Sequence, residues 1–211
     1  MAIFDFDGTL FNTVDDVVIC FNKALKANNF PTLTYDEYIE RLGGNIDEIV
    51  SLILNDQNTP ENIELIKREY GKLYSESKKE NSKPYPEILD LLNDLQSRNI
   101  LLAINSNRTT PSIKQFVERY LSDIDFLEIE GHNEDYPSKP SPWGITKIIE
   151  KADVSLYDAI YIGDSKTDIK TAQNAGIDCV IVKWGYGNQK DYENEYILGV
   201  VDKPSEILNY F

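Results

Sequence analysis

Short apolar runs alternate with amphipathic helical patterns through most of the 211 residues, and this alternation limits the fold more than any other feature. The runs are continuously apolar, as is typical of strands buried on both faces of a parallel sheet. Strand and helix alternation of this kind indicates an α/β protein with helices covering a parallel sheet. The strands are predicted at Ala2–Phe4, Ile100–Ile104, Phe126–Ile129, Ala159–Ile162 and Cys179–Val182.

The helices of this sheet are predicted from apolar residues that recur on one side of each segment. They lie at Pro86–Arg98, Pro111–Leu121, Pro142–Lys151 and Thr167–Ala175. Near the C-terminus we expect an edge strand at Tyr196–Val201 and a short closing helix at Pro204–Phe211.

A block of about 70 residues between the first two strands contains helical patterns only, which is too long for an ordinary crossover. We interpret it as an inserted α-helical subdomain of residues 13–83, with residues 1–12 and 84–211 forming the α/β core. Its helices are predicted at Val14–Ala27, with Thr13 as a cap, and at Thr34–Leu42, Ile46–Leu54 and Pro60–Ser82.

The charge balance excludes several classes of partner. The chain has 36 acidic and 21 basic residues, a formal net charge of −15, which argues against nucleic acid and against anionic membranes as partners. It has no apolar run of about 20 residues and no basic leader at its N-terminus, so we expect a cytoplasmic protein. We expect a monomer or a weak homodimer.

The sequence also disfavours several kinds of catalytic site. The single histidine, His132, cannot build a zinc site from several histidines, and Cys20 and Cys179 are expected to be buried thiols in a reducing compartment. No G-x-S-x-G, G-x-G-x-x-G or P-loop pattern occurs, which disfavours serine hydrolases, dinucleotide binding and P-loop chemistry.

Polar residues follow four of the predicted strands, where the ligand sites of open α/β sheets lie. Asp5 and Asp7 leave the first strand on the same side, since strand side chains repeat every two residues. Asp164 and Asp168 are four residues apart, which would put them on one face of a helix starting there. Carboxylates crowded without His or Cys favour a hard cation, Mg²⁺ above all, and Ser106 and Lys139 can donate to an anionic oxygen there.

Each of these residues also has a plain structural interpretation. An Asp-x-Asp pair is common in turns, and Asp164 or Ser106 alone can cap a helix. Lys139 alone is most often solvated. The hypothesis of a site therefore depends on their joint occurrence, each behind its own strand.

Four segments resemble the motifs of the haloacid dehalogenase superfamily. They are Asp-Phe-Asp-Gly-Thr-Leu at 5–10, Asn-Ser-Asn-Arg at 105–108, Lys-Pro-Ser-Pro at 139–142 and Gly-Asp-Ser-Lys-Thr-Asp at 163–168. The resemblance implies a Rossmann-like core. The inserted helices resemble the α-helical cap of its phosphoglycolate phosphatase and β-phosphoglucomutase branch.

The resemblance implies a role for each matching position. Asp5 would be the nucleophile and Asp7 the general acid and base. Ser106 and Lys139 would hold the phosphoryl oxygens. The metal ligands would be Asp5, the backbone carbonyl of Asp7, Asp164 and Asp168, the last directly or through water.

Further positions are expected around the substrate. Thr9 would orient Asp7, and a cap loop containing Arg41 and Asn45 would face the leaving group, although that loop is equally well a solvated helix break. The full set of substrate-binding candidates is Gly8, Thr9, Asn107, Arg108, Arg41 and Asn45.

The resemblance implies a Mg²⁺-dependent phosphatase that acts on a small phosphorylated metabolite through an aspartyl-phosphate. Asp7 favours phosphoester chemistry over dehalogenation, and Thr9 is more typical of phosphatases than of mutases. Two alternatives stay open: a sugar-phosphate mutase of the β-phosphoglucomutase type, and a non-catalytic phosphate-binding regulatory protein.

Overall fold

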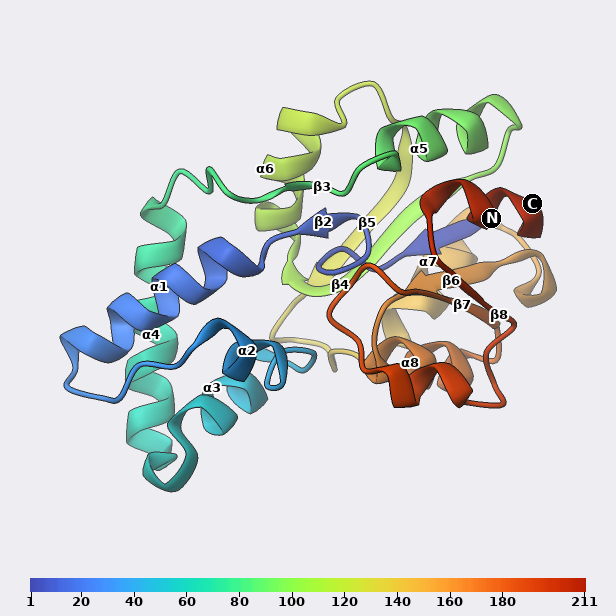
Figure 1. Ribbon diagram of the computed structural model, residues 1–211. Helices are drawn as coiled ribbons and strands as arrows, with labels where there is room; N and C mark the ends of the chain where they lie inside the picture. The colour runs from blue at the N-terminus through green and yellow to red at the C-terminus, as the bar shows by residue number, and fades with distance from the viewer. The chain divides into compact units, whose positions relative to one another are not determined.

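The computed structural model describes the whole chain, Met1–Phe211, and divides it into two units. One unit combines Met1–Phe11 with Pro84–Phe211, and the other is the helical segment Asn12–Lys83. Figure 1 shows the chain leaving the first unit after its first strand and returning before α5.

The first unit is built on a parallel sheet of six strands in the order β5-β4-β1-β6-β7-β8. The first strand of the chain therefore lies in the middle, between β4 and β6, and its last residue, Phe4, is paired with Ile104 and Ile162. This order brings the carboxyl ends of strands that are distant in sequence to one edge. The strands are β1 (Ala2–Phe4), β4 (Leu102–Thr109), β5 (Phe126–His132), β6 (Ile160–Gly163), β7 (Asp178–Val182) and β8 (Gly199–Val201).

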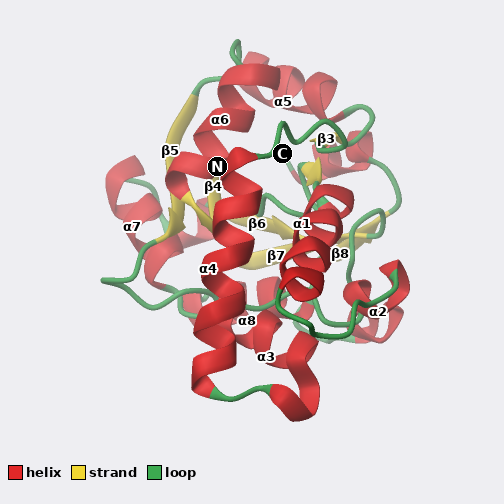
Figure 2. Cartoon of the chain, turned by 90° about the vertical axis from the view of Figure 1, so that its left-hand side faces the viewer, coloured by secondary structure: helices red, strands yellow, loops and turns green.

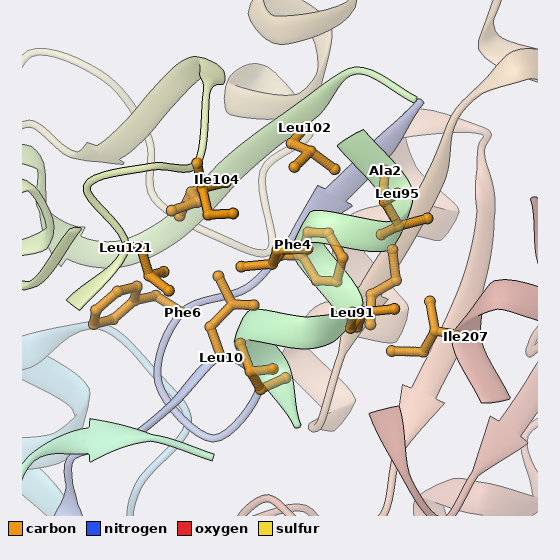
Figure 3. Packing of buried hydrophobic residues seen from close by; sticks show 14 of the residues in the cluster. Ala2, Phe4, Phe6, Leu10, Leu91, Leu95, Leu102, Ile104, Leu121 and Ile207 are labelled. Atoms are coloured by element: carbon orange, nitrogen blue, oxygen red, sulfur yellow. The ribbon is translucent and has the colours of Figure 1, made fainter. Parts of the chain in front are cut away.

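Helices cover both faces of this sheet, which explains why its strands are continuously apolar. Phe4 and Ile104 lie in the hydrophobic cluster that includes α5 (Ile88–Ser97) and α6 (Thr110–Tyr120). Figure 3 shows Phe4 between Leu91 of α5 and the neighbouring strand residues. Ile3, one residue earlier, lies in the opposite cluster with α7 (Trp143–Ala152) and α8 (Lys166–Ala175).

The second unit consists of four helices, of which α1 and α4 run alongside each other (Figure 2). Aromatic rings fill the interior: Phe21 of α1 stacks on Tyr70 of α4 with 3.8 Å between ring centroids. Tyr38 is fully buried and its hydroxyl donates to Asn22. The helices are α1 (Val14–Ala27), α2 (Tyr35–Ile39), α3 (Ile46–Leu54) and α4 (Pro60–Glu76).

The structure corrects several element boundaries. Helix α4 ends at Glu76, not Ser82, because Ser77 turns to extended backbone. Strand β4 continues to Thr109, which pairs with His132 at the end of β5. Thr13 precedes α1 but its side chain makes no capping hydrogen bond.

Several short elements have no clear signal in the sequence. The strands β2 (Phe11–Asn12) and β3 (Lys83–Pro84) pair with each other where the chain passes between the units. The predicted closing helix is a 3₁₀ segment, Pro204–Tyr210. Further 3₁₀ turns lie at Asn55–Gln57, Leu156–Asp158 and Gln189–Glu193.

Both cysteines, Cys20 and Cys179, are buried thiols, as predicted. None of the helices is at once long and apolar enough to cross a lipid bilayer.

Candidate active site

Three aspartates from separate segments meet at the carboxyl edge of the sheet. Asp5 follows β1, Asp164 follows β6, and Asp168 lies in the first turn of α8. Each offers a carboxylate oxygen within 4.8 Å of the others, and all three side chains are buried. The strand order β4-β1-β6 produces this meeting, because β1 and β6 are direct neighbours.

Lys139 supplies the positive charge within this group. Its ammonium Nζ lies 2.6 Å from Oδ1 of Asp5 and 2.7 Å from Oδ1 of Asp168, and the lysine is itself buried. Nζ also lies 3.2 Å from the hydroxyl of Tyr161, which in turn donates to the carbonyl of Asn105 at 3.0 Å. The two carboxylates raise the pKa of Lys139 well above its ordinary value, against the effect of burial, so the lysine stays charged.

Asp168 is anchored by the start of its own helix. Its Oδ2 accepts from the Ser165 hydroxyl at 2.7 Å and from the backbone N–H groups of Ser165 and Asp164. The expectation that Asp164 and Asp168 share a helix face is wrong, because α8 begins at Lys166 and Ser165 is its N-cap. They are brought together by the tight turn between β6 and α8.

The charge of the cluster fits a divalent cation. Three carboxylates face one ammonium, and burial together with Asp168 and Asp5 raises the pKa of Asp164 well above its ordinary value. Burial also raises the pKa of Asp5 to about 7, although Lys139 opposes this. An all-oxygen donor set with excess negative charge suits Mg²⁺. Both oxygens of Asp168 already accept hydrogen bonds, so Asp5 and Asp164 are the better direct ligands.

Asp7 lies at the rim of this cluster and is paired with Arg108. The guanidinium Nη2 lies 2.6 Å from Oδ1 of Asp7, and Nε lies 3.0 Å from Oδ2, a two-pronged ion pair. The Asp7 side chain is 30% exposed, whereas the Arg108 side chain is 10% exposed. The pair therefore holds the Asp7 carboxylate at the opening of the site.

One side chain joins the last part of β4 to the loop carrying Lys139. The amide of Asn107 donates to the Lys139 carbonyl at 3.2 Å and accepts from the Lys139 N–H at 2.8 Å. Ser106, buried beside it, accepts from the Arg108 N–H at 3.1 Å. The Lys139–Pro140 peptide bond, whose isomer the sequence leaves open, is cis.

Gly8 and Thr9 shape the turn that follows Asp7. Gly8 has φ +85°, and a Cβ there would lie 2.3 Å from Oδ2 of Asp164, so this turn requires glycine. The Thr9 hydroxyl is buried without a hydrogen-bond partner, so it does not orient Asp7 in this structure. Its carbonyl instead accepts from the indole N–H of Trp184.

Arg41 and Asn45 belong to the helical unit and make local contacts there. Asn45 caps α3, with its side chain accepting from the Glu48 N–H. Arg41 donates to the Glu37 carbonyl. Their role toward a substrate stays a prediction.

Three residues that support the cluster were missed from the sequence. Tyr161 lies in an apolar strand pattern, Ser165 resembles an ordinary cap, and Tyr186 acts through its backbone N–H, 2.6 Å from Oδ2 of Asp164. The Gly163–Asp168 motif gave a signal for Ser165.

The parallel sheet gathers buried carboxylates and a lysine at its carboxyl edge. The protein is therefore an α/β protein whose candidate site is built from residues at the strand ends. The family model of haloacid dehalogenase-like hydrolases matches residues 2–182, and the chain belongs to this family.

Individual relatives agree with this assignment. A phosphoglycolate phosphatase from Agrobacterium fabrum is 30% identical over 88% of this chain and 81% of its own length. One from Vibrio parahaemolyticus is 25% identical over 99% of this chain and 94% of its own length. A haloacid dehalogenase-like hydrolase structure from Streptococcus pneumoniae superposes with a TM-score of 0.90 at 25% identity, covering 100% of this chain and 97% of the other.

Proposed function

We propose that this hydrolase is a Mg²⁺-dependent phosphatase that acts on a small phosphorylated metabolite through an aspartyl-phosphate on Asp5. The observation that carries the proposal is the buried Asp5–Lys139–Asp168 group beside Asp164 at the carboxyl edge of the sheet. The names of the relatives in Agrobacterium fabrum and Vibrio parahaemolyticus make phosphoglycolate the first substrate to test.

Asp5 is the proposed nucleophile because of how its two oxygens are placed. Lys139 holds Oδ1 at 2.6 Å, which fixes the carboxylate and leaves Oδ2 to attack phosphorus. The attack forms a bond between Oδ2 and phosphorus as the bond to the leaving oxygen breaks. Lys139 and the Ser106 hydroxyl then neutralise and hold the phosphoryl oxygens, the main requirement of phosphoryl transfer.

Asp7 is the proposed acid and base. It gives a proton to the leaving oxygen, and in the second step it takes a proton from the water that attacks phosphorus and releases phosphate from Asp5. In the structure its carboxylate is held by Arg108, so Asp7 must leave this pair to donate a proton. The anionic groups of a substrate can compete for the same guanidinium and so release Asp7.

Asp164, the Asp7 carbonyl and Oδ1 of Asp5, the oxygen that Lys139 also contacts, would hold Mg²⁺, so that Oδ2 of Asp5 stays free for phosphorus, and Asp168 would support them. When bound, the ion would supply positive charge next to the transferring phosphoryl group. We further propose that the helical unit, residues 13–83, is a cap that determines substrate choice, with Arg41 or Asn45 facing the leaving group. Unchanged kinetics of Arg41→Ala on the physiological substrate would contradict that role.

The first experiment compares wild type with Asp5→Asn in Mg²⁺. We expect release of inorganic phosphate from phosphoglycolate and from a generic aryl phosphate to fall by about 10³-fold or more, because the amide is a poor nucleophile. The matched control is Asp178→Asn, an exposed aspartate at the amino end of β7, which should keep full activity. Activity retained in Asp5→Asn would refute the assignment.

Product analysis separates the two catalytic alternatives. A phosphatase releases inorganic phosphate from its substrate, whereas a mutase returns an isomeric phosphate. No Mg²⁺-dependent turnover of any phosphoester in the wild type would favour a non-catalytic role.

A further inference from the structure

A small cavity lies next to the candidate active site, within the α/β unit. It has a volume of about 20 Å³, opens partly to solvent, and is lined by the ends of β4 and β5, the following loop and the start of α7. Tyr136 and Trp143, stacked with ring centroids 4.0 Å apart, form part of its wall. Ser106 and Lys139, the proposed phosphoryl-binding residues, also line it. A molecule bound in the cavity would therefore contact both residues.

Two polar side-chain atoms in the wall of this cavity are buried without a hydrogen-bond partner. One is Nδ2 of Asn105, a residue only 4% exposed, and the other is Nδ1 of His132. Nearly all buried polar atoms in proteins are paired, either with protein groups or with bound water. Two such atoms around one cavity therefore point to a ligand that serves both.

The Asn105 amide nitrogen can only donate, so its ligand must accept. A histidine Nδ1 accepts when the ring proton is on Nε2 and donates when the proton is on Nδ1. A ligand that can both accept and donate serves the two atoms with either nitrogen carrying the proton. The buried carboxylate of Glu130, held on one side by Lys147 at 2.6 Å, lines the same cavity and offers a third partner as an acceptor.

A single water molecule meets each of these requirements. A cavity must offer about 10–15 Å³ to hold one water, and buried waters make about three hydrogen bonds on average. A metal cation is disfavoured, since the amide N–H₂ of Asn105 would point at it.

We propose that this cavity is a binding site for one ordered water, which accepts from Asn105 and donates to His132 and Glu130. The water bridges the side chain of Asn105 in β4 and those of Glu130 and His132 in β5. No protein hydrogen bond connects the Asn105 side chain to the other two. The Asn105 carbonyl accepts from Tyr161, so the same residue connects the water to the Lys139 group. Asn105 and His132 are thus positioning residues for the strand end that carries Ser106.

The single histidine of the chain makes a direct test possible, because its ring nitrogen signals need no assignment. We expect long-range ¹⁵N spectra at neutral pH to show Nδ1 unprotonated and hydrogen-bonded, with magnetisation transfer from the ring to a long-lived water. A high-resolution crystal structure should show one water within about 2.7–3.2 Å of both nitrogens. A protonated Nδ1, a cavity without density, or Asn105 paired with a protein group instead would overturn the proposal.

Two substitutions at the same position separate the water from packing alone. His132→Asn keeps a polar atom near the Nδ1 position and should retain the water, whereas His132→Leu should lose it in the crystal structure. On an aryl phosphate we expect His132→Leu to lower kcat about fivefold with little change in KM, and His132→Asn to restore most of it. Equal loss in both variants would refute the positioning role. This kinetic expectation rests on the proposed phosphatase activity, whereas the histidine spectrum does not, so the two can fail separately.

Discussion

Tyr161 shows how a single hydroxyl completes a buried charged group. It lies within an apolar strand, yet its hydroxyl donates to the Asn105 carbonyl at 3.0 Å and lies 3.2 Å from Nζ of Lys139 and 3.3 Å from Oδ1 of Asp168. Burial raises the pKa of this phenol well above its ordinary value, so it stays protonated and can keep donating. Strand periodicity alone predicts only that this side chain is buried.

Tyr161→Phe should therefore damage both stability and turnover. It removes a donor to a buried carbonyl and one partner of Lys139, so we expect a loss of about 1–2 kcal/mol in the free energy of unfolding. We also expect kcat on an aryl phosphate to fall by about 3- to 10-fold. Urea denaturation and steady-state kinetics measure the two effects. Tyr157→Phe is the matched control, because Tyr157 is 94% exposed, and it should change stability by less than about 0.5 kcal/mol. Equal effects of the two substitutions would contradict this view of Tyr161.

The elements were most predictable where local signals and tertiary contacts agree. Strand β1 and helices α1 and α3 have the predicted bounds. Their apolar residues face the hydrophobic clusters of the two units, so the local pattern and the tertiary contacts coincide. Helix α4 was predicted too long, because the segment after Glu76 is held by Asp16, which accepts from Asn81 and Ser82. Such a contact joins residues about 65 positions apart and leaves no local pattern.

The candidate site, like the helices and strands, was predictable only where the sequence carries a local signal. The four clusters of polar residues could be predicted from the sequence, because each comes after an apolar strand core, although in the structure β4 itself continues through residues 105–108 and Lys139 lies in the loop beyond β5. The Asn107 bridge to Lys139 and the Arg108 pair with Asp7 could not be predicted, because they join the end of β4 to residues 32 and 101 positions away and leave no local pattern.

The ion pair between Glu128 of β5 and Lys151 of α7 predicts a pH-dependent contribution to stability. Burial alone would raise the pKa of Glu128, but the hydrogen bond and charge of Lys151, with the Ile129 N–H and the charge of Lys147, together hold this pKa below its ordinary value. A carboxyl with a depressed folded-state pKa adds stability above its unfolded pKa of about 4.3, and that stability is lost as the pH falls through the folded-state value.

Glu128→Gln should thus lower the free energy of unfolding at pH 7 by about 0.5 kcal/mol, a small value because the lysine is half exposed. The difference from wild type should vanish near pH 3, as followed by urea denaturation across this range. Glu134→Gln, at an exposed position in the loop after β5, is the matched control substitution. A Glu128→Gln deficit that stays constant with pH would contradict the linkage.

At the scale of the whole molecule, the net charge of −15 is compatible with an anionic substrate because charge acts locally. Surface carboxylates are screened beyond about 8–10 Å at ordinary ionic strength, whereas the buried cluster is screened much less. Three carboxylates in this cluster face one lysine. A cation bound there should therefore increase the stability of the α/β unit.

Mg²⁺ should stabilise the folded protein, and Asp164 should be required for this. At about 100 times the dissociation constant, a ligand that binds only the folded state adds about 2.7 kcal/mol, or about 5–10 °C in Tm for a chain of this length. Asp164→Asn should show no such rise, yet without metal it should melt above wild type, because burial and the nearby Asp168 and Asp5 disfavour a charge at this position and raise the pKa of Asp164. The amide oxygen still accepts from the Tyr186 N–H, so the fold keeps that contact.

Calorimetry with and without Mg²⁺, with Asp178→Asn as the wild-type-like control, measures both effects. An equal Mg²⁺-induced rise in Asp164→Asn and in wild type would place the ion elsewhere and remove Asp164 from the metal site.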